Sequence, residues 1–263
     1  MKPDSELEGI TALLVDLDGV LYVGEEPLPG VIDAVAKLRA AGLGLRFVTN
    51  TTARSRRATL EKLVGLGIEL EAEELITPAV LARRRCEESG YRHLGLIMDA
   101  AVKEDFAGLE EVDEAPDAVI MGDLGSDFGF EILNAAFRMV FGGAELIALQ
   151  KNRFWRTGDG LSLDAGPFVA AIEYATGATA EVVGKPSPAF FELVLDSLGV
   201  GPEEAAMIGD DIESDIGGAI DSGLRALLVR TGKYEERFVA DSGITPTLML
   251  DSIADAPRAL GIA

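Results

Sequence analysis

Two aspartates separated by one residue stand at the end of an apolar run near the beginning of the chain. Residues 10–17 predict a buried strand, and Asp16, Asp18 and Gly19 lie at its carboxyl end. Side chains this close along an extended chain face the same region, and two carboxylates repel each other unless a cation or a proton intervenes. A metal-assisted site is therefore the first hypothesis, although the pattern alone also fits a strand that enters a polar turn.

A second apolar run ends in Thr49 and Asn50, and a helix is expected from residue 54. A hydroxyl group and backbone N–H groups at a strand-to-helix turn are suited to holding the oxygens of a phosphate. Capping of the helix by Thr51 or Thr52 explains the same residues equally well, so this segment alone does not decide between the two interpretations.

Lys185 lies between Gly184 and Pro186, just before a helix expected at residues 189–198. Proline is common in the first turn of a helix, so the lysine is expected in the loop that precedes it. A single lysine is usually a solvated surface charge. In an acidic protein, however, a lysine held in a rigid frame could supply the positive charge that a phosphate site needs.

The strand expected at residues 205–209 repeats the opening pattern, because Asp210 and Asp211 follow it directly. Asp215 comes about one helical turn later and can face back toward the same loop. One such acid is commonly explained by the helix dipole, which favours acids at helix N-termini. Several acids at a second strand end favour a magnesium (Mg²⁺) site, since this ion prefers a few carboxylates, water and substrate phosphate as ligands.

Short apolar strands alternate with helical patterns along the chain, which is typical of parallel α/β proteins. The carboxyl ends of parallel strands share one edge of a sheet, so the three polar clusters are expected to converge there. The middle section has no comparable cluster and is interpreted as an inserted domain, residues 78–181, within a discontinuous core of residues 1–77 and 182–263. The expected strands are residues 10–17, 43–49, 94–98, 118–121, 146–149, 205–209 and 225–229, and the expected helices are residues 31–40, 54–66, 131–141, 167–176, 189–198 and 214–222.

The composition restricts the class of protein. The chain has 263 residues, 48% of them hydrophobic, and a formal net charge of −22, which argues against a surface for nucleic acid or anionic membranes. A single cysteine rules out an internal disulfide and suits a reducing compartment, so a cytoplasmic location is expected. No apolar stretch reaches membrane-spanning length. A single histidine excludes histidine-rich zinc sites and assigns acid–base chemistry to carboxylates.

Four segments, DLDGV, the strand ending in Thr49-Asn50, GKPSP and GDDIESD, resemble in this order the four motifs of the haloacid-dehalogenase-like (HAD) phosphohydrolases. The large insertion between the second and third motifs resembles the NagD-like subfamily. Longer segments, among them RFVTNTT, LDAGPFVAAIEYATG and VVGKPSPAFF, are similar to the branch that contains phospholysine phosphohistidine inorganic pyrophosphate phosphatase. The resemblance implies a Rossmann-like parallel-sheet core with a smaller inserted α/β cap domain.

The resemblance also implies a mechanism. Asp16 would be the nucleophile that forms an aspartyl-phosphate, and Asp18 would protonate the leaving group and then activate water. Mg²⁺ would bind the carboxylates of Asp16 and Asp210 and the backbone carbonyl of Asp18, which neutralises charge on the phosphate.

The remaining matching residues would support this reaction. Thr49, Asn50 and Lys185 would hold the transferring phosphate oxygens. Asp211 and Asp215 would orient metal-bound water or Lys185, and Asp211 is expected to lie nearer the metal.

The implied activity is a Mg²⁺-dependent phosphatase of small phosphorylated metabolites, either phosphomonoesters or pyrophosphate-like compounds. The cap would contribute to substrate specificity. Asp164 resembles a cap position that faces the core, and would bind the leaving group of the substrate. Because NagD-like relatives often pair through their caps, a homodimer is expected. Two alternatives stay open: phosphoryl transfer to a second acceptor, and a non-catalytic protein that binds phospho-ligands or acts as a scaffold. A phospho-receiver domain uses similar residues but is much shorter and lacks such an insert.

Overall fold

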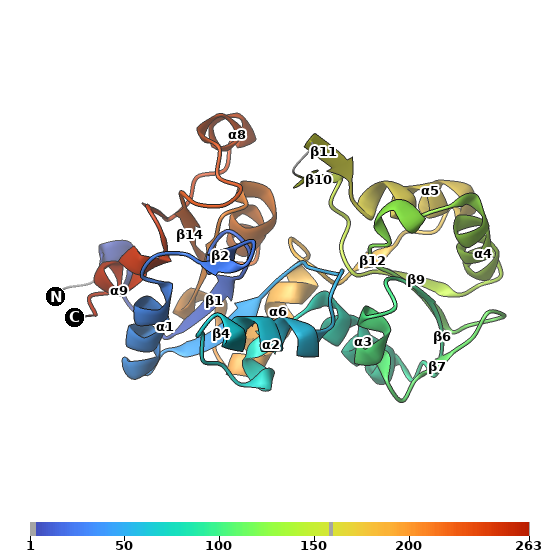
Figure 1. The fold of residues 1–263 in the computed structure, drawn as a ribbon, viewed down its shortest axis with the longest axis horizontal. Coiled ribbons are helices and arrows are strands. Elements are labelled where there is room, and N and C mark those ends of the chain that lie inside the picture. The colour runs from blue at the N-terminus through green and yellow to red at the C-terminus, as the bar shows by residue number, and fades with distance from the viewer. Residues whose placement is uncertain (1–3, 158–159, 263) are drawn as a thin grey trace. The chain divides into compact units, whose positions relative to one another are not determined.

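The computed structural model describes residues 4–157 and 160–262, which form two compact units, each with its own parallel sheet. The first unit comprises Met1–Thr49, Leu60–Ile76 and Lys185–Ala263, and the second comprises Asn50–Thr59 and Thr77–Gly184. The segments near both ends of the chain therefore belong to one unit, while the green and yellow middle of the chain in Figure 1 forms most of the other. The α/β fold class predicted from the sequence is confirmed.

The first unit is built on a six-stranded sheet in the order β15-β14-β13-β1-β4-β5, in which all neighbouring strands run parallel. All residues of β1 are buried, as expected for a central parallel strand that helices cover on both faces. The strands of this sheet are β1 (Ala12–Asp16), β4 (Gly44–Val48), β5 (Leu75–Ile76), β13 (Ala205–Gly209), β14 (Arg225–Val229) and β15 (Leu248–Leu250). A small separate hairpin consists of β2 (Tyr22–Val23) and β3 (Glu26–Pro27).

Helix α6 of this unit begins and ends at residues that favour helix termini. Pro188 occupies the first turn of α6, where its missing N–H costs nothing, and Gly199 ends this helix in the left-handed conformation. On one face of the sheet Leu13 and Val15 pack in a single core with Val35 of α1. The helices are α1 (Val31–Ala40), α6 (Pro188–Leu198), α7 (Gly218–Asp221), α8 (Glu236–Ser242) and α9 (Ala256–Ala259), while the residues of α2 (Arg56–Gly65) are divided between the two units.

The helix predicted at residues 214–222 takes a different form. The structure has a π-helix at Ile212–Gly217 that leads directly into the short α7. In the π-helix the N–H of Ile216 bonds to the carbonyl of Asp211 at 3.2 Å, five residues back, so the turn is wider than that of an α-helix. Wide turns of this kind frequently occur at functional sites.

The second unit is built on a five-stranded sheet in the order β12-β9-β8-β6-β7, again entirely parallel. Val119 and Leu146 of this sheet share a core with Val140 of α4 and Val169 of α5. The elements are α3 (Pro78–Ser89), β6 (His93–Ile97), β7 (Glu110–Glu111), β8 (Ala118–Met121), α4 (Phe130–Phe141), β9 (Glu145–Ala148), the antiparallel pair β10 (Phe154–Thr157) and β11 (Gly160–Leu163), α5 (Gly166–Thr176) and β12 (Glu181–Val182).

Within residues 4–157 and 160–262, no helix is both long enough and apolar enough to cross a lipid bilayer.

Candidate active site

Acids from two neighbouring strands of the first unit meet at the carboxyl edge of the sheet. Asp16 is the last residue of β1, and Asp210 directly follows β13, which pairs with β1 in parallel. Asp215 lies in the π-helix that follows. The three residues are 7%, 2% and 1% exposed, and each offers a carboxylate oxygen within 4.8 Å of the others. Parallel pairing of the strands therefore brings together acids from opposite ends of the chain.

Lys185 provides the positive charge inside this cluster. Its Nζ donates to Oδ1 of Asp16 at 2.5 Å and to Oδ1 of Asp215 at 2.6 Å, and the residue is 2% exposed. Burial by itself would lower the pKa of Lys185, but the two carboxylates hold this pKa above its ordinary value. The lysine therefore stays charged throughout the physiological pH range.

The cluster carries more negative charge than its lysines neutralise. Four carboxylates, those of Asp16, Asp210, Asp211 and Asp215, lie around the ammonium groups of Lys185 and Lys233. Burial, together with the charges of Asp16 and Asp215, raises the pKa of Asp210 to about 8. When all four carboxylates are ionised, they exceed the two ammonium groups by two negative charges, which one divalent cation would balance. Without a cation, the raised pKa of Asp210 keeps this carboxyl largely protonated near neutral pH. The oxygen-only donor set fits Mg²⁺, which binds hard ligands.

The structure places Asp215, rather than Asp211, among the closely spaced carboxylates. Oδ1 of Asp211 accepts the backbone N–H groups of Glu213 and Ser214, so it caps the π-helix, and its Oδ2 accepts from Lys233 Nζ at 3.1 Å. The oxygens of Asp211 are thus engaged in capping and in an ion pair, and its place nearer the metal stays a prediction.

Asp18 lies two residues beyond β1 and is exposed, in contrast to Asp16. Its segment forms a tight turn, in which the N–H of Gly19 donates to the carbonyl of Tyr22 at 2.8 Å. The carboxylate of Asp18 is in contact with solvent, whereas that of the buried Asp16 is shielded from it. Asp16 and Asp18, which are separated by one residue in the sequence, therefore occupy different environments.

The other predicted residues are divided between the two units. Thr49 follows β4 in the first unit, is 3% exposed, and donates its N–H to Ile76 at 3.3 Å. Asn50 and Asp164 belong to the second unit. Asp164 is 8% exposed, and its Oδ1 accepts from Gln150 Nε2 and, at 2.7 Å, from the N–H of Ala165.

Thr231 and Lys233, in the loop after β14, were not predicted as site residues from the sequence. Thr231 donates from Oγ1 to the carbonyl of Gly19 at 2.5 Å, and the N–H of Lys233 donates to Oδ2 of Asp210 at 2.6 Å. The segment RTGKY could have identified these two residues from the sequence. It follows an apolar strand, so its lysine and its hydroxyl group lie at the same sheet edge as the acids.

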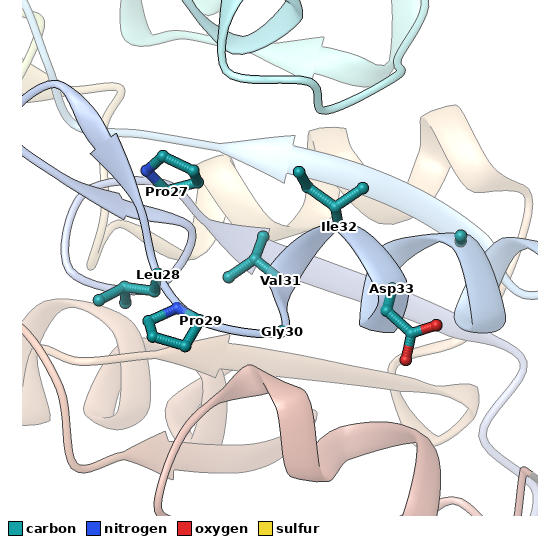
Figure 2. A pocket seen from close by; sticks show the side chains of 8 residues that line it. Pro27, Leu28, Pro29, Gly30, Val31, Ile32 and Asp33 are labelled. Carbon is teal, nitrogen blue, oxygen red and sulfur yellow. The ribbon is translucent and has the colours of Figure 1, made fainter.

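A separate cavity of about 610 Å³ lies at the start of α1 (Figure 2). It is lined mainly by apolar side chains, among them Leu28, Val31 and Ile32, and Asp33 is its only charged lining residue. None of the predicted site residues lines it. We therefore assign the chemistry to the acid cluster at the strand ends.

Comparison with known proteins agrees with this geometry. The family described as haloacid dehalogenase-like hydrolase matches residues 13–110, and the family described as HAD-hydrolase-like matches residues 182–256. Haloacid dehalogenase-like hydrolase domain-containing protein 2 of Homo sapiens is 45% identical over 86% of each chain. The chain belongs to the haloacid dehalogenase-like hydrolases. The family resemblance predicted from the four motifs is thereby confirmed.

Other members of the haloacid dehalogenase-like family extend the comparison. Phospholysine phosphohistidine inorganic pyrophosphate phosphatase of Xenopus laevis is 41% identical over 94% of this chain and 93% of its own length. A glycerol phosphate phosphatase of Mycobacterium tuberculosis, solved in complex with magnesium, superposes with a TM-score of 0.83 at 28% identity and covers 98% of this chain and 78% of its own.

Proposed function

We propose that this hydrolase is a Mg²⁺-dependent phosphatase of small phosphorylated compounds. The observation that carries the proposal is the buried group of Asp16, Asp210 and Asp215 around Lys185, which combines a carboxylate nucleophile, a cation site and a fixed positive charge. The names of the relatives support it, because one acts on phospholysine, phosphohistidine and pyrophosphate and another on glycerol phosphate. The bound magnesium of the second relative supports the choice of ion.

In the proposed mechanism Asp16 attacks phosphorus and the bond to the leaving oxygen breaks, which gives an aspartyl-phosphate. Lys185 holds Oδ1 of Asp16, so the other carboxylate oxygen is the one positioned to react. Asp18, at the exposed turn, gives its proton to the leaving oxygen. As a carboxylate it then takes a proton from the water that attacks phosphorus, which releases phosphate and restores Asp16.

Asp16, Asp210 and the backbone carbonyl of Asp18 would hold the Mg²⁺ ion, whose chemistry when bound is to neutralise charge on the phosphate. Thr49, Asn50 and Lys185 would hold the transferring oxygens. We assign Asp215 the role of orienting Lys185, because its Oδ1 accepts from Nζ and its Oδ2 accepts from the N–H of Asp211 at 3.1 Å. Asp211 would support the same turn.

We further propose that residues 78–181 act as a cap domain that selects the substrate, inserted in a core of residues 1–77 and 182–263. The separate sheet and core of the second unit support an independent domain. Because the carboxylate of Asp164 already binds Gln150 and Ala165, its contribution would be to fix the shape of the loop before α5. A cytoplasmic location, supported by the single buried thiol of Cys86, is part of the same proposal.

We also propose a homodimer that forms through the second unit. Three large side chains on α4 and α5 are left in solvent: Phe130 is 80% exposed, Phe141 69% and Tyr174 95%. Aromatic side chains are enriched at protein interfaces. Sedimentation of the purified protein tests this, and a monomer at micromolar concentration would contradict it.

The catalytic proposal is tested by phosphate release from p-nitrophenyl phosphate with Mg²⁺ or with EDTA. We compare the native chain with Asp16→Asn, and use Asp196→Asn on α6 as a control, since Asp196 is exposed and is not one of the acids of the cluster. Mg²⁺-dependent turnover that only Asp16→Asn abolishes supports the proposal. Full activity of Asp16→Asn would refute the mechanism. An added alcohol acceptor distinguishes hydrolysis from transfer, because transfer yields a phosphorylated alcohol.

A further inference from the structure

The loop after β14 touches two parts of the candidate metal site at once. Because β13 and β14 pair in parallel, with Gly209 opposite Leu228, the loop begins at the sheet edge where Asp210 lies. The hydroxyl of Thr231 donates to the carbonyl of Gly19, in the turn that follows Asp18, at 2.5 Å. The loop is therefore tied to the end of β1 through one side chain.

The same loop holds Asp210 through the backbone. The N–H of Lys233 donates to Oδ2 of Asp210 at 2.6 Å, and the Nζ of Lys233 donates to Oδ2 of Asp211 at 3.1 Å. A bond to one carboxylate oxygen fixes the rotation of the group, and so fixes where the other oxygen lies. The ammonium group meanwhile offsets the charge of Asp211.

Two glycines enclose the carboxylate of Asp210. Gly19 has φ +84° and Gly232 has φ +60°, and a Cβ at either position would lie 1.9 Å from Oδ2 of Asp210. No side chain fits at this distance, and both backbone conformations are ones that L-residues rarely adopt. Asp210 is thus clamped between the turn after β1 and the loop after β14.

We infer that Thr231, Gly232 and Lys233 are positioning residues that set the affinity of the site for Mg²⁺. The inference rests on the proposed function, because it takes Asp210 and the Asp18 turn as the groups that hold the ion. The loop acts on both: it fixes the Asp210 carboxylate by a hydrogen bond and by close backbone packing, and it fixes the turn by the Thr231 hydroxyl.

The test measures Mg²⁺ binding without turnover. For each variant we determine the dissociation constant for Mg²⁺ by calorimetric titration with MgCl₂, and check it against the rise in melting temperature as the Mg²⁺ concentration increases. Thr231→Val removes the hydroxyl at nearly constant volume, and Thr231→Ser restores it. Gly232→Ala introduces the clash with Asp210. Its matched control is Gly243→Ala, since Gly243 has φ +70° but nothing within 4 Å of an added Cβ.

We expect Thr231→Val and Gly232→Ala to need about 10- to 100-fold more Mg²⁺ than the native protein, the range seen when the support of a metal ligand is removed. Thr231→Ser and Gly243→Ala should bind Mg²⁺ as the native protein does. Melting temperatures in EDTA separate loss of Mg²⁺ affinity from loss of folding. If Gly232→Ala does not fold, Thr231→Val and its serine rescue decide the question.

Two results would overturn the inference. If the native protein binds Mg²⁺ and Thr231→Val binds it equally well, the loop does not set the affinity, and the proposed function is unaffected. If the native protein itself does not respond to Mg²⁺, the metal site of the proposed function fails and the inference fails with it.

Discussion

Replacing Asp210 by asparagine should stabilise the metal-free protein while abolishing its response to Mg²⁺. Asp210 is 2% exposed, and burial together with the charges of Asp16 and Asp215 raises its pKa from the ordinary 3.8 to about 8. Since the folded state holds the proton more tightly than the unfolded state, the folded state loses stability as the pH rises between these two values. Asparagine has no such charge and keeps an oxygen that can accept the N–H of Lys233.

The size of the effect follows from the pKa. Each pH unit between 3.8 and 8 costs the folded state at most about 1.4 kcal/mol. From pH 5 to pH 7.5 this amounts to roughly 3 kcal/mol, and because the three carboxylates share the repulsion we expect Asp210→Asn to recover about 1–2 kcal/mol of it. In a chain of this size that corresponds to a rise of about 4 °C in the melting temperature.

The assay is thermal unfolding in EDTA at pH 5 and pH 7.5, repeated with Mg²⁺. Stabilisation by Asp210→Asn should be larger at pH 7.5 than at pH 5, and Mg²⁺ should stabilise the native protein but not the variant. Asp196→Asn serves as the control and should behave as the native chain at both pH values. The reasoning is refuted if Asp210→Asn is less stable than the native protein at pH 7.5, or if its advantage is independent of pH.

Three further predictions concern the rest of the chain. Burial raises the pKa of the Cys86 thiol to about 11. At pH 8 this thiol should therefore react with Ellman's reagent only after the protein is unfolded in urea. Rapid reaction of the native protein would contradict this prediction. Lys185→Met leaves buried carboxylates without their ion pair and should cost about 3–5 kcal/mol of unfolding free energy. Lys37→Met, which breaks an exposed ion pair, should cost less than about 1 kcal/mol. Equal costs for the two variants would argue against a buried pair. Phe190→Ala, at a fully buried position, should cost about 3–5 kcal/mol of unfolding free energy. Phe238→Ala, at a position 42% exposed and outside the proposed dimer surface, should cost about 1 kcal/mol or less, as measured by urea unfolding.

The fold was predictable where hydrophobic patterns were long and regular. The strand expected at residues 205–209 is β13, and the helix expected at residues 31–40 is α1, because continuous apolar runs and amphipathic spacing determine these elements locally. Two-residue strands such as β5 and β12 were not expected. Such strands are too short to show a period, and they exist only because a neighbouring strand pairs with them.

The candidate site was predictable to the extent that polar residues follow apolar strands. Asp16 and Asp210 could be assigned to one sheet edge because strand ends in a parallel sheet meet there. The relative places of Asp211 and Asp215 could not, since they depend on the wide π-helical turn, which has no sequence signature at this length. The contact of Lys233 with Asp210 is made by the backbone N–H, and a backbone contact leaves no trace in the residue type.

The central strand pair of the first unit has a consequence for synthesis on the ribosome. β4 ends at Val48, so β1 and β4 are both available for pairing early in synthesis, but the other neighbour of β1, β13, begins only at Ala205. Until then the second edge of β1 has no partner, while β6, β8 and β9 of the second unit can already pair with one another. The nascent chain must therefore carry an open, apolar strand edge for most of its translation, a state prone to aggregation that chaperones commonly protect. Because Asp16 meets Lys185, Asp210 and Asp215 only when β13 docks, the acid cluster is assembled late, and no shorter nascent chain contains it.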